Sequence, residues 1–295
     1  MQPDIECVVQ SADILGEVPL WCSRTKKLWW VDVRRPCLQS YDPVTRAHRA
    51  IRLPDGMATG SIALREAGGI LLATSSGFYV YDPAKPEPPR ALANPEKDKP
   101  DNRLNDGKCD RRGRFWGGTM DFACEARSGA LYRYDPDGRC TRHEMGFAVT
   151  NGPTWSLDER TMYFNDTVRG RIHAFDFDAG TGALANQREW LRLARGDGLP
   201  DGMTTDAAGR LWLAHWGGAC VSCHDPISGA ELGRIALPTD HITNCAFGGP
   251  GLRTLFITSA RSGLSAEQLA AQPQAGGLFA VELDEAGLPA SMFGG

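Results

Sequence analysis

Short apolar segments separated by polar and turn-forming residues recur along the whole chain. The strongest of them begin at Leu28, Ile70, Phe115, Met162, Leu211 and Leu255, so that their starting points lie about 45 residues apart. Their length of about five residues and their aromatic and branched side chains favour β-strands over helices. A second strand-like segment follows each one. It often ends in an aromatic residue plus Asp-Pro, as at Tyr41 and Tyr81, a combination that stops a strand and opens a turn.

Six repeats of this length, each with room for about four short strands, predict an all-β fold, a six-bladed β-propeller. We expect a single domain over residues 1–295. The segment Ile5-Glu-Cys-Val-Val is expected to supply the outer strand of the last blade, pairing near Leu278-Phe-Ala-Val. A β-sandwich would also contain many short strands, but it would not predict six-fold similarity. Helical periodicity is confined to one short segment, Ala266–Ala271.

Composition and charge narrow the classes of partner. The chain is 42% hydrophobic with a formal net charge of −4, and it has no basic block, so we expect no nucleic-acid partner. The N-terminus lacks a basic start and an apolar core, and no apolar run approaches the roughly 18 residues needed to cross a bilayer. We therefore expect a cytoplasmic protein without membrane contact, either a monomer or a weak homo-oligomer. The nine scattered cysteines are expected to be reduced thiols. The Cys220 and Cys223 pair has no second pair beside it, which favours packing over zinc or redox chemistry.

Polar residues occupy equivalent places in the repeats, on the strand before each strong apolar segment. Ten or eleven residues before the six starting points lie Glu17, Thr59-Gly60, Asn105, Asn151, Asp201 and Asn244. In a four-stranded blade this preceding strand lines the central channel. Five of the six repeats place a carboxylate or a carboxamide there, so the sequence predicts a ring of oxygen donors at one end of the channel.

Turn formation is the competing interpretation, because Asn-Gly and Asp-Gly pairs are common in turns. Equivalence across the repeats favours the ring. Two carboxylates that face each other in a channel repel and are costly to desolvate unless a cation lies between them. Glu17, Asn151 and Asp201 form an all-oxygen set, which suits one divalent ion: calcium, magnesium, manganese, zinc or Fe(II). Three protein ligands would leave positions for water and substrate.

Other chemistries have no support in the sequence. The chain has no G-x-S-x-G nucleophile elbow, no H-E-x-x-H zinc helix, no Walker loop and no dinucleotide-binding fingerprint. The six histidines show no ligand spacing. His215 is placed to face the channel, although a structural role is expected for it.

The chain resembles the gluconolactonase and regucalcin (senescence marker protein) family of sugar lactonases at several stretches, in the family's order. They are Leu15-Gly-Glu-Val-Pro-Leu-Trp21, Arg103-Leu-Asn-Asp-Gly-Lys108, Gly113-Arg-Phe-Trp-Gly-Gly-Thr-Met120, Thr150-Asn-Gly-Pro-Thr-Trp-Ser156, Pro200-Asp-Gly-Met203, Cys245-Ala-Phe-Gly-Gly249 and Gln274-Ala-Gly-Gly-Leu-Phe279. The resemblance implies a six-bladed propeller with one divalent metal in its channel, held by Glu17, Asn151 and Asp201. It implies further that Asp201 is the catalytic general base and that Arg103 and Asn105 contact substrate.

One departure bears on the substrate. Some members of that family carry an acidic sugar-binding residue shortly after the Gly-Thr-Met stretch, where this chain has Ala123. Either Asp121 or Glu125 substitutes for it, or the contact is absent.

The resulting hypothesis is a metal-dependent lactonase that opens aldonolactones, such as glucono-, xylono-, arabinono- or galactonolactone, to aldonic acids. Three alternatives remain: a calcium-binding regulatory protein, a propeller scaffold for protein partners, and a broader metal-dependent esterase or phosphotriesterase. A scaffold has no need for two carboxylates facing an open site. A calcium buffer has no need for Arg103 beside the ion.

Overall fold

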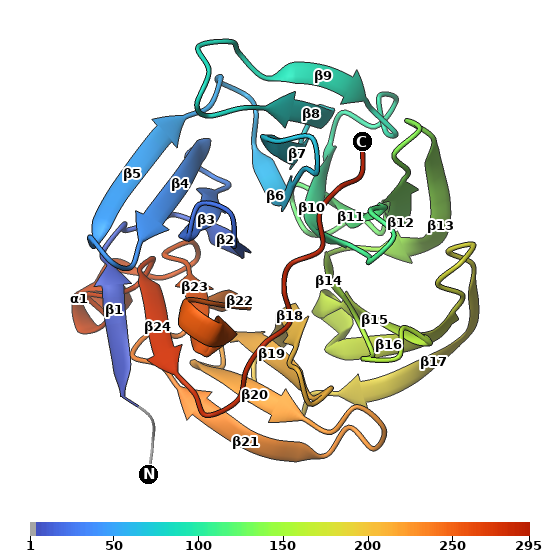
Figure 1. Cartoon of the computed structure of the whole chain (residues 1–295). Coiled ribbons are helices and arrows are strands. Elements are labelled where there is room, and N and C mark those ends of the chain that lie inside the picture. Colours follow the sequence, from blue (N-terminus) through green and yellow to red (C-terminus); the bar gives the residue numbers. More distant parts are fainter. Residues whose placement is uncertain (1–3) are drawn as a thin grey trace.

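The structure is a computed structural model, and it describes residues 4–295. These residues form six four-stranded sheets, which are arranged as blades around a central channel (Figure 1). The pairing within every sheet is antiparallel, for example between β2 (Gly16–Cys22) and β3 (Lys27–Asp32). The prediction of an all-β six-bladed propeller is confirmed.

Blades 1 to 5 each use four consecutive strands. Blade 1 contains β2, β3, β4 (Cys37–Asp42) and β5 (Ala47–Arg52). Blade 2 contains β6 (Thr59–Leu64), β7 (Ile70–Thr74), β8 (Gly77–Tyr81) and β9 (Arg90–Ala93). Blade 3 contains β10 (Asn102–Cys109), β11 (Phe115–Asp121), β12 (Gly129–Tyr134) and β13 (Cys140–Phe147). Blade 4 contains β14 (Thr150–Trp155), β15 (Thr161–Asp166), β16 (Arg171–Phe177) and β17 (Leu184–Arg192). Blade 5 contains β18 (Leu199–Thr205), β19 (Leu211–Trp216), β20 (Cys220–His224) and β21 (Glu231–Ala236).

Blade 6 joins the two ends of the chain. It contains β22 (Ile242–Gly248), β23 (Thr254–Ser259) and β24 (Leu278–Glu282), and its outer strand is β1 (Ile5–Val9) from the N-terminal end. Ile5 pairs with Val281 and Cys7 pairs with Phe279, as the sequence predicted. This pairing closes the ring, so that no blade presents a long unpaired inner edge.

The expected helix is present as α1 (Ala266–Ala271). It begins with a capping box, in which the Ser265 hydroxyl accepts the Gln268 N–H while the Gln268 side chain accepts the Ser265 N–H. Two short 3₁₀ turns, η1 (Thr167–Arg169) and η2 (Pro250–Leu252), were not expected from the sequence. Of these, η1 directly follows β15 and lies close to the inner strand of the same blade.

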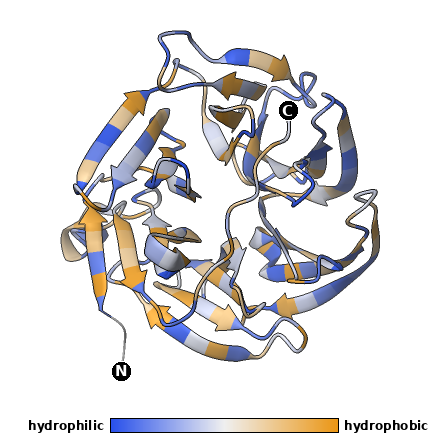
Figure 2. Cartoon of the chain, in the orientation of Figure 1, coloured by the Kyte–Doolittle hydropathy of each residue, from blue (hydrophilic) through white to orange (hydrophobic). Residues whose placement is uncertain are grey.

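Burial explains the strand pattern. The second strands, β7, β11 and β23 among them, are buried along their whole length because both of their faces pack against neighbouring blades. They therefore appear in the sequence as continuous apolar segments. The outermost strands β5 and β17 are exposed over most of their length and carry stretches of hydrophilic residues (Figure 2).

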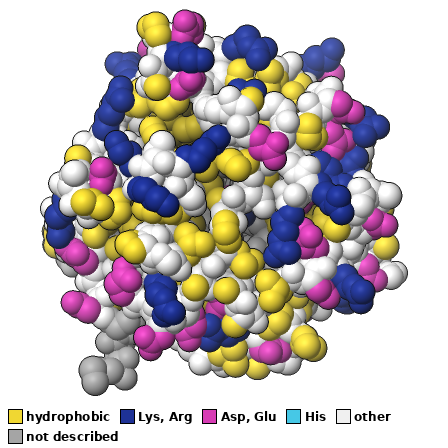
Figure 3. Space-filling view, in the orientation of Figure 1, with side chains coloured by type: hydrophobic (Ala, Val, Ile, Leu, Met, Phe, Trp, Pro, Cys, Tyr) yellow, Lys and Arg dark blue, Asp and Glu magenta, His cyan; other side chains and the backbone are white. Residues whose placement is uncertain are grey.

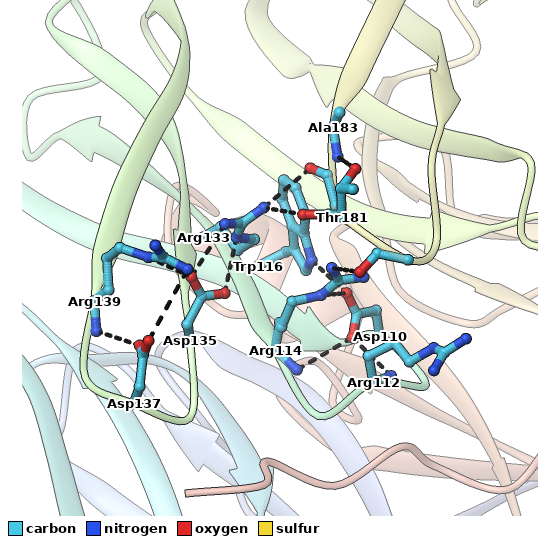
Figure 4. Close-up of polar contacts among 12 residues, drawn as sticks. Asp110, Arg112, Arg114, Trp116, Arg133, Asp135, Asp137, Arg139, Thr181 and Ala183 are labelled. Carbon is cyan, nitrogen blue, oxygen red and sulfur yellow. Dashed lines mark hydrogen bonds and ion pairs between the residues drawn. The ribbon is translucent and has the colours of Figure 1, made fainter.

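A repeated side-chain motif stabilises blades 3 and 5 near the C-terminal segment, which contacts both loops at Gly113 and Asp206. In blade 3 the Asp110 carboxylate accepts the Arg114 Nε–H at 2.6 Å and the Trp116 Nε1–H at 2.9 Å (Figure 4). Arg114 also donates to the carbonyl of Ala179 in blade 4. Blade 5 repeats the first two contacts with Asp206, Arg210 and Trp212. These aspartates hold their own loops, and the arginines paired with them reach neighbouring segments, at Ala179 for Arg114 and at Glu285 for Arg210. This is a structural use of a buried carboxylate.

The C-terminal strap, residues 283–295, crosses the opening of the channel on the face drawn toward the viewer (Figure 1). Its Ala286 carbonyl accepts the Ala207 N–H of blade 5. Phe293 exchanges backbone hydrogen bonds with Leu64 and Glu66 of blade 2. On this face the basic and acidic side chains are interspersed (Figure 3).

A cavity of about 130 Å³ lies under the strap, lined among others by Trp21, Lys108, Trp155, Phe247 and Leu288. The inner-strand residues in this lining follow the predicted ring of oxygen donors in sequence, for example Trp21 after Glu17. Since the inner strands run in one direction along the channel, the strap covers the mouth opposite to that ring.

None of the helices in residues 4–295 is long and apolar enough to cross a membrane. The nine cysteines are free thiols. Cys220 and Cys223 are both buried in β20, which agrees with the packing role predicted for them.

The strap makes a testable contribution to stability through Phe293, which is 2% exposed and stacks on Tyr134 with ring centroids 5.4 Å apart. Phe293→Ala should lower the free energy of unfolding by about 3–5 kcal/mol, because burial and packing of the ring are lost together. Urea denaturation followed by tryptophan fluorescence measures this. Ile227→Ala is the control, since Ile227 is 90% exposed and its replacement should change little. Equal effects of the two substitutions would show that the strap does not stabilise the ring.

Candidate active site in the channel

The six polar positions predicted to form a ring all lie on the innermost strands of the blades. Glu17 is on β2, Thr59 and Gly60 on β6, Asn105 on β10, Asn151 on β14, Asp201 on β18 and Asn244 on β22. All of the side chains are buried. The inference from repeat equivalence to a common place in the fold is therefore confirmed.

The competing interpretation, that the Asn-Gly and Asp-Gly pairs form turns, is wrong because these residues lie within strands. Asp201 and Gly202 lie inside β18, where the pairing with β19 shifts register between Pro200 and Met203. The register shifts near the equivalent residue in every inner strand. Such β-bulges insert an extra residue and redirect side chains. Here they turn polar side chains into the channel.

Gly202, which follows Asp201, is needed because a neighbouring side chain packs closely against its backbone, and not because it forms a turn. A Cβ atom on Gly202 would lie 1.9 Å from Cγ of Asn244. Gly202 therefore lets blade 6 bring its amide against the bulge of blade 5.

Three of the predicted residues form one hydrogen-bonded chain. Arg103 donates to the amide oxygen of Asn105. The Asn105 amide donates to the carbonyl of Thr150 at 2.7 Å and to Oδ1 of Asn151 at 2.9 Å. Asn151 in turn donates to the hydroxyl of Thr167 at 3.0 Å. These contacts fix Oδ1 of Asn151 as an acceptor that keeps one lone pair free.

Glu17 and Asp201 are the two buried carboxylates of the set, each 4% exposed. Burial, reinforced by the charge of Asp106, raises the pKa of Glu17 to about 8. Burial, together with the charges of Glu17 and Asp106, raises the pKa of Asp201 well above its ordinary value. Oδ1 of Asp201 is buried without a hydrogen-bond partner, whereas its backbone carbonyl accepts from Asn165.

Asp106 and Lys108 belong to the same channel, although the sequence analysis did not assign them a role. Asp106 is 1% exposed, and its charge acts on both Glu17 and Asp201. In a regular strand, adjacent residues face opposite sides. The bulge between Leu104 and Gly107 brings Asn105 and Asp106 into the channel together. Strict alternation along the strand predicts that Asp106 points away from the channel. Its position next to Asn105 is the one feature of the sequence that could have indicated a role for it.

Glu17, Asn151 and Asp201 fit a divalent cation. In residues 4–295, no three His, Cys, Asp or Glu side chains form a group suited to a metal ion, so a cation here would use the Asn151 amide with two carboxylates. The donors are all oxygen, and Asp201 Oδ1 has no other partner. A cation would also favour the ionised forms of Glu17 and Asp201 against burial and their mutual repulsion, which raise the pKa of both carboxyl groups.

A partly exposed aromatic ring, that of Phe122, lies near Arg103. The Phe122 ring centroid lies 5.9 Å from the Arg103 guanidinium carbon, and Phe122 is 37% exposed. Asp121 uses Oδ2 to accept the N–H groups of Glu125 and Ala126, so this oxygen holds the loop. Glu125 is exposed.

His215 has a structural role in the fold, as expected. It is fully buried, and its ring nitrogens bond to the carbonyl of Asp197 at 2.8 Å and the hydroxyl of Ser222 at 2.6 Å. His224 bonds to the other side of the same hydroxyl at 2.7 Å.

The chain is similar in sequence and structure to several known proteins. Residues 15–261 match the family model described as the SMP-30/gluconolactonase/LRE-like region. The chain is 36% identical to a regucalcin of Xenopus laevis, over 94% of this chain and 93% of that protein. It is 33% identical to a putative sugar lactone lactonase, YvrE, of Bacillus subtilis, over 96% of both chains. Among solved structures, a calcium-binding regucalcin from Agrobacterium tumefaciens superposes with a TM-score of 0.92 at 28% identity, covering 97% of this chain and 96% of that one.

The raised pKa of Glu17 predicts how the stability of the metal-free protein depends on pH. Its pKa is about 8 when folded and near 4.5 ordinarily. The folded state therefore holds a proton that the unfolded state releases, so this contribution to stability is full below about pH 4.5 and is lost as pH rises toward 8. We expect the urea midpoint in the presence of a chelator to fall over this range through Glu17.

Glu17→Gln is the matched control, because it keeps the shape and cannot ionise. Burial lowers the pKa of His215 and His224, which makes stability rise with pH. The difference between the wild type and Glu17→Gln at each pH cancels these histidines and leaves the effect of the Glu17 carboxyl group, including its effect on Asp201. A difference that does not change between pH 5 and 8 would contradict the assignment.

Proposed function

Because this chain belongs to the SMP-30/gluconolactonase/LRE-like family, we propose that it is a metal-dependent hydrolase that opens sugar lactones to aldonic acids. The observation that supports this most is Oδ1 of Asp201, buried without a hydrogen-bond partner in a site that also contains Arg103 and Asn105. A group that only stabilised the fold would have its acceptors paired, as in Asp110 and Asp206.

Glu17, Asn151 and Asp201 would hold one divalent ion. When bound, such an ion supplies a Lewis acid for the lactone carbonyl oxygen and lowers the pKa of nearby water. The name of the Agrobacterium structure includes calcium binding, which supports calcium as one occupant. Magnesium, manganese, zinc and Fe(II) share the preference for this donor set.

The protein's own groups divide the remaining work. Asp201 receives the proton of the attacking water, and for this it must be ionised, a state that the cation favours against the effect of burial. Arg103 donates hydrogen bonds to lactone or hydroxyl oxygens, since its guanidinium carries five donors and only part of them are used by Leu104 and Asn105. Burial of the site keeps bulk water from competing for these contacts.

The test is a substrate panel with metal-stripped protein reloaded with each of the five ions. Aldonolactones, aryl esters and phosphotriesters are compared, with acid release followed by titration and spontaneous lactone opening subtracted. The proposal predicts the highest kcat/KM for an aldonolactone. Tight calcium binding without turnover would instead favour a regulatory protein, and faster cleavage of aryl esters or phosphotriesters a broader esterase.

Asp201→Asn tests the general base. The substitution keeps one oxygen ligand and the packing of the bulge, and it removes the proton acceptor. The rate of lactone opening should fall at least about a hundredfold at full metal occupancy, because general-base catalysis contributes about 10²–10⁴-fold. Occupancy is measured directly by elemental analysis. Near-normal turnover with the site filled would make Asp201 a ligand only.

Arg103→Ala and Asn105→Ala test the substrate contacts. Both should impair lactone hydrolysis at saturating metal while the fold is retained. Asn105→Ala should also weaken metal binding, because the Asn105 amide bonds to Oδ1 of Asn151. For Arg103→Ala the metal affinity should be unchanged or tighter, because a positive charge near the cation is removed. Calorimetric titration measures the metal affinity of each variant, and kcat/KM measures its lactone hydrolysis. A metal site that stays empty at saturating metal in either variant would show that a ligand has been mistaken for a substrate contact.

A further inference from the structure

Asp106 is a buried carboxylate whose hydrogen bonds join three different blades. Oδ1 accepts the Gly107 N–H at 2.7 Å on its own strand. Oδ2 accepts the Gly152 N–H of blade 4 at 3.0 Å and the Asn244 amide of blade 6 at 3.2 Å. Blade 6 lies opposite blade 3 in a six-membered ring, so the contact with Asn244 crosses the channel.

The residues that Asp106 holds adjoin the proposed metal ligands. Gly152 directly follows Asn151 in β14. Asn244 packs on Gly202, which directly follows Asp201 in β18. The first contact therefore ends one residue away from Asn151, and the second ends on a side chain that packs against the residue after Asp201. Both neighbouring residues, Gly152 and Gly202, lie on bulged segments whose backbone conformation decides where the ligand points.

Lys108 extends the same connection to blade 5. Its ammonium donates to the carbonyl of Met203, two residues after Asp201. Its charge favours the ionised form of Asp106, against the effect of burial, which raises the pKa of that carboxyl to about 6. Asp106 and Lys108 together thus reach from β10 to β14, β18 and β22.

Asp106 differs from Asp201 in what its oxygens do. Both oxygens of Asp106 accept hydrogen bonds from the protein, and the positive charge of Lys108 favours the ionised form of its carboxyl group. Oδ1 of Asp201 has no partner. Of the two, Asp201 is the carboxylate available to a metal ion, and Asp106 is committed to the scaffold.

We propose that Asp106 and Lys108 form a cross-channel brace that positions Asn151 and Asp201 for the cation, with Asp106 and Lys108 acting as positioning residues. This inference rests on the proposed metal site. Outer contacts that orient ligands commonly change metal affinity by about 10–100-fold when they are removed. The brace would do so through the backbone beside each ligand.

The experiment measures the dissociation constant of calcium and of manganese by calorimetric titration of the metal-stripped protein. Asp106→Asn should raise it at least about tenfold. Lys108→Met is the decisive variant. If the pair acted only through charge, loss of the ammonium would tighten cation binding. The brace predicts weaker binding, because the contact with Met203 is lost.

Asp110→Asn is the matched control. Asp110 is a buried carboxylate just beyond the same strand with four protein hydrogen bonds, none of which reaches the channel. It should lower the melting temperature of metal-free and metal-loaded protein equally and leave the dissociation constant unchanged. For Asp106→Asn and Lys108→Met, the gap between the two melting temperatures should shrink at a fixed metal concentration.

The outcomes separate the brace from the site on which it rests. If the wild type binds neither metal, the proposed metal site is wrong and the brace falls with it. If the wild type binds and Asp106→Asn binds equally well, or Lys108→Met binds more tightly, the brace is overturned while the site stands. Should Asp106→Asn not fold, Lys108→Met alone decides, because its apolar stem keeps the packing.

Discussion

Closure of the ring is the constraint on which the rest of the structure depends. β1 pairs with β24, and this contact joins two segments from opposite ends of the chain in one blade. Because the ring is closed, six inner strands face a common axis, and their side chains must share one narrow channel. The strap and the Asp–Arg–Trp motifs of blades 3 and 5 reinforce the closure at one face only. The opposite end of the channel is left to the polar residues.

Sharing the channel creates an electrostatic conflict. Glu17, Asp106 and Asp201 are all nearly inaccessible to water, and burial raises the pKa of each. Arg103 and Lys108 are the positive side chains whose charges act on them, and burial lowers the pKa of Arg103 to about 10. Lys108 accompanies Asp106. Glu17 and Asp201 are left with the single positive charge of Arg103 acting on both. Two ionised carboxylates would therefore carry an excess of negative charge, which a divalent cation would offset.

Buried aspartates have two different roles in this fold, and the number of hydrogen-bond donors around each carboxylate distinguishes the roles. Asp110 and Asp206 accept backbone, arginine and tryptophan N–H groups until their lone pairs are occupied. Asp201 lacks a donor for Oδ1. Asp110 and Asp206, with their acceptors paired, hold loops together, whereas Asp201 keeps the capacity to bind a cation or to take a proton.

The sequence by itself determined the fold and the blade positions of the candidate residues. Repeats of about 45 residues and buried second strands leave a direct trace in the order of side chains. Equivalence of repeats then placed Glu17, Asn151 and Asp201 on inner strands. The tertiary structure decided which side chains turn into the channel and which hydrogen bonds they make. The bulges that turn Asn105 and Asp106 into the channel together break the alternation on which strand interpretation depends. The contact of Asp106 with Asn244 joins residues 138 positions apart, and no local pattern records which donors reach a buried carboxylate. Periodicity is a property of neighbours along the chain, whereas the pairing of charges and hydrogen bonds is a property of neighbours in space.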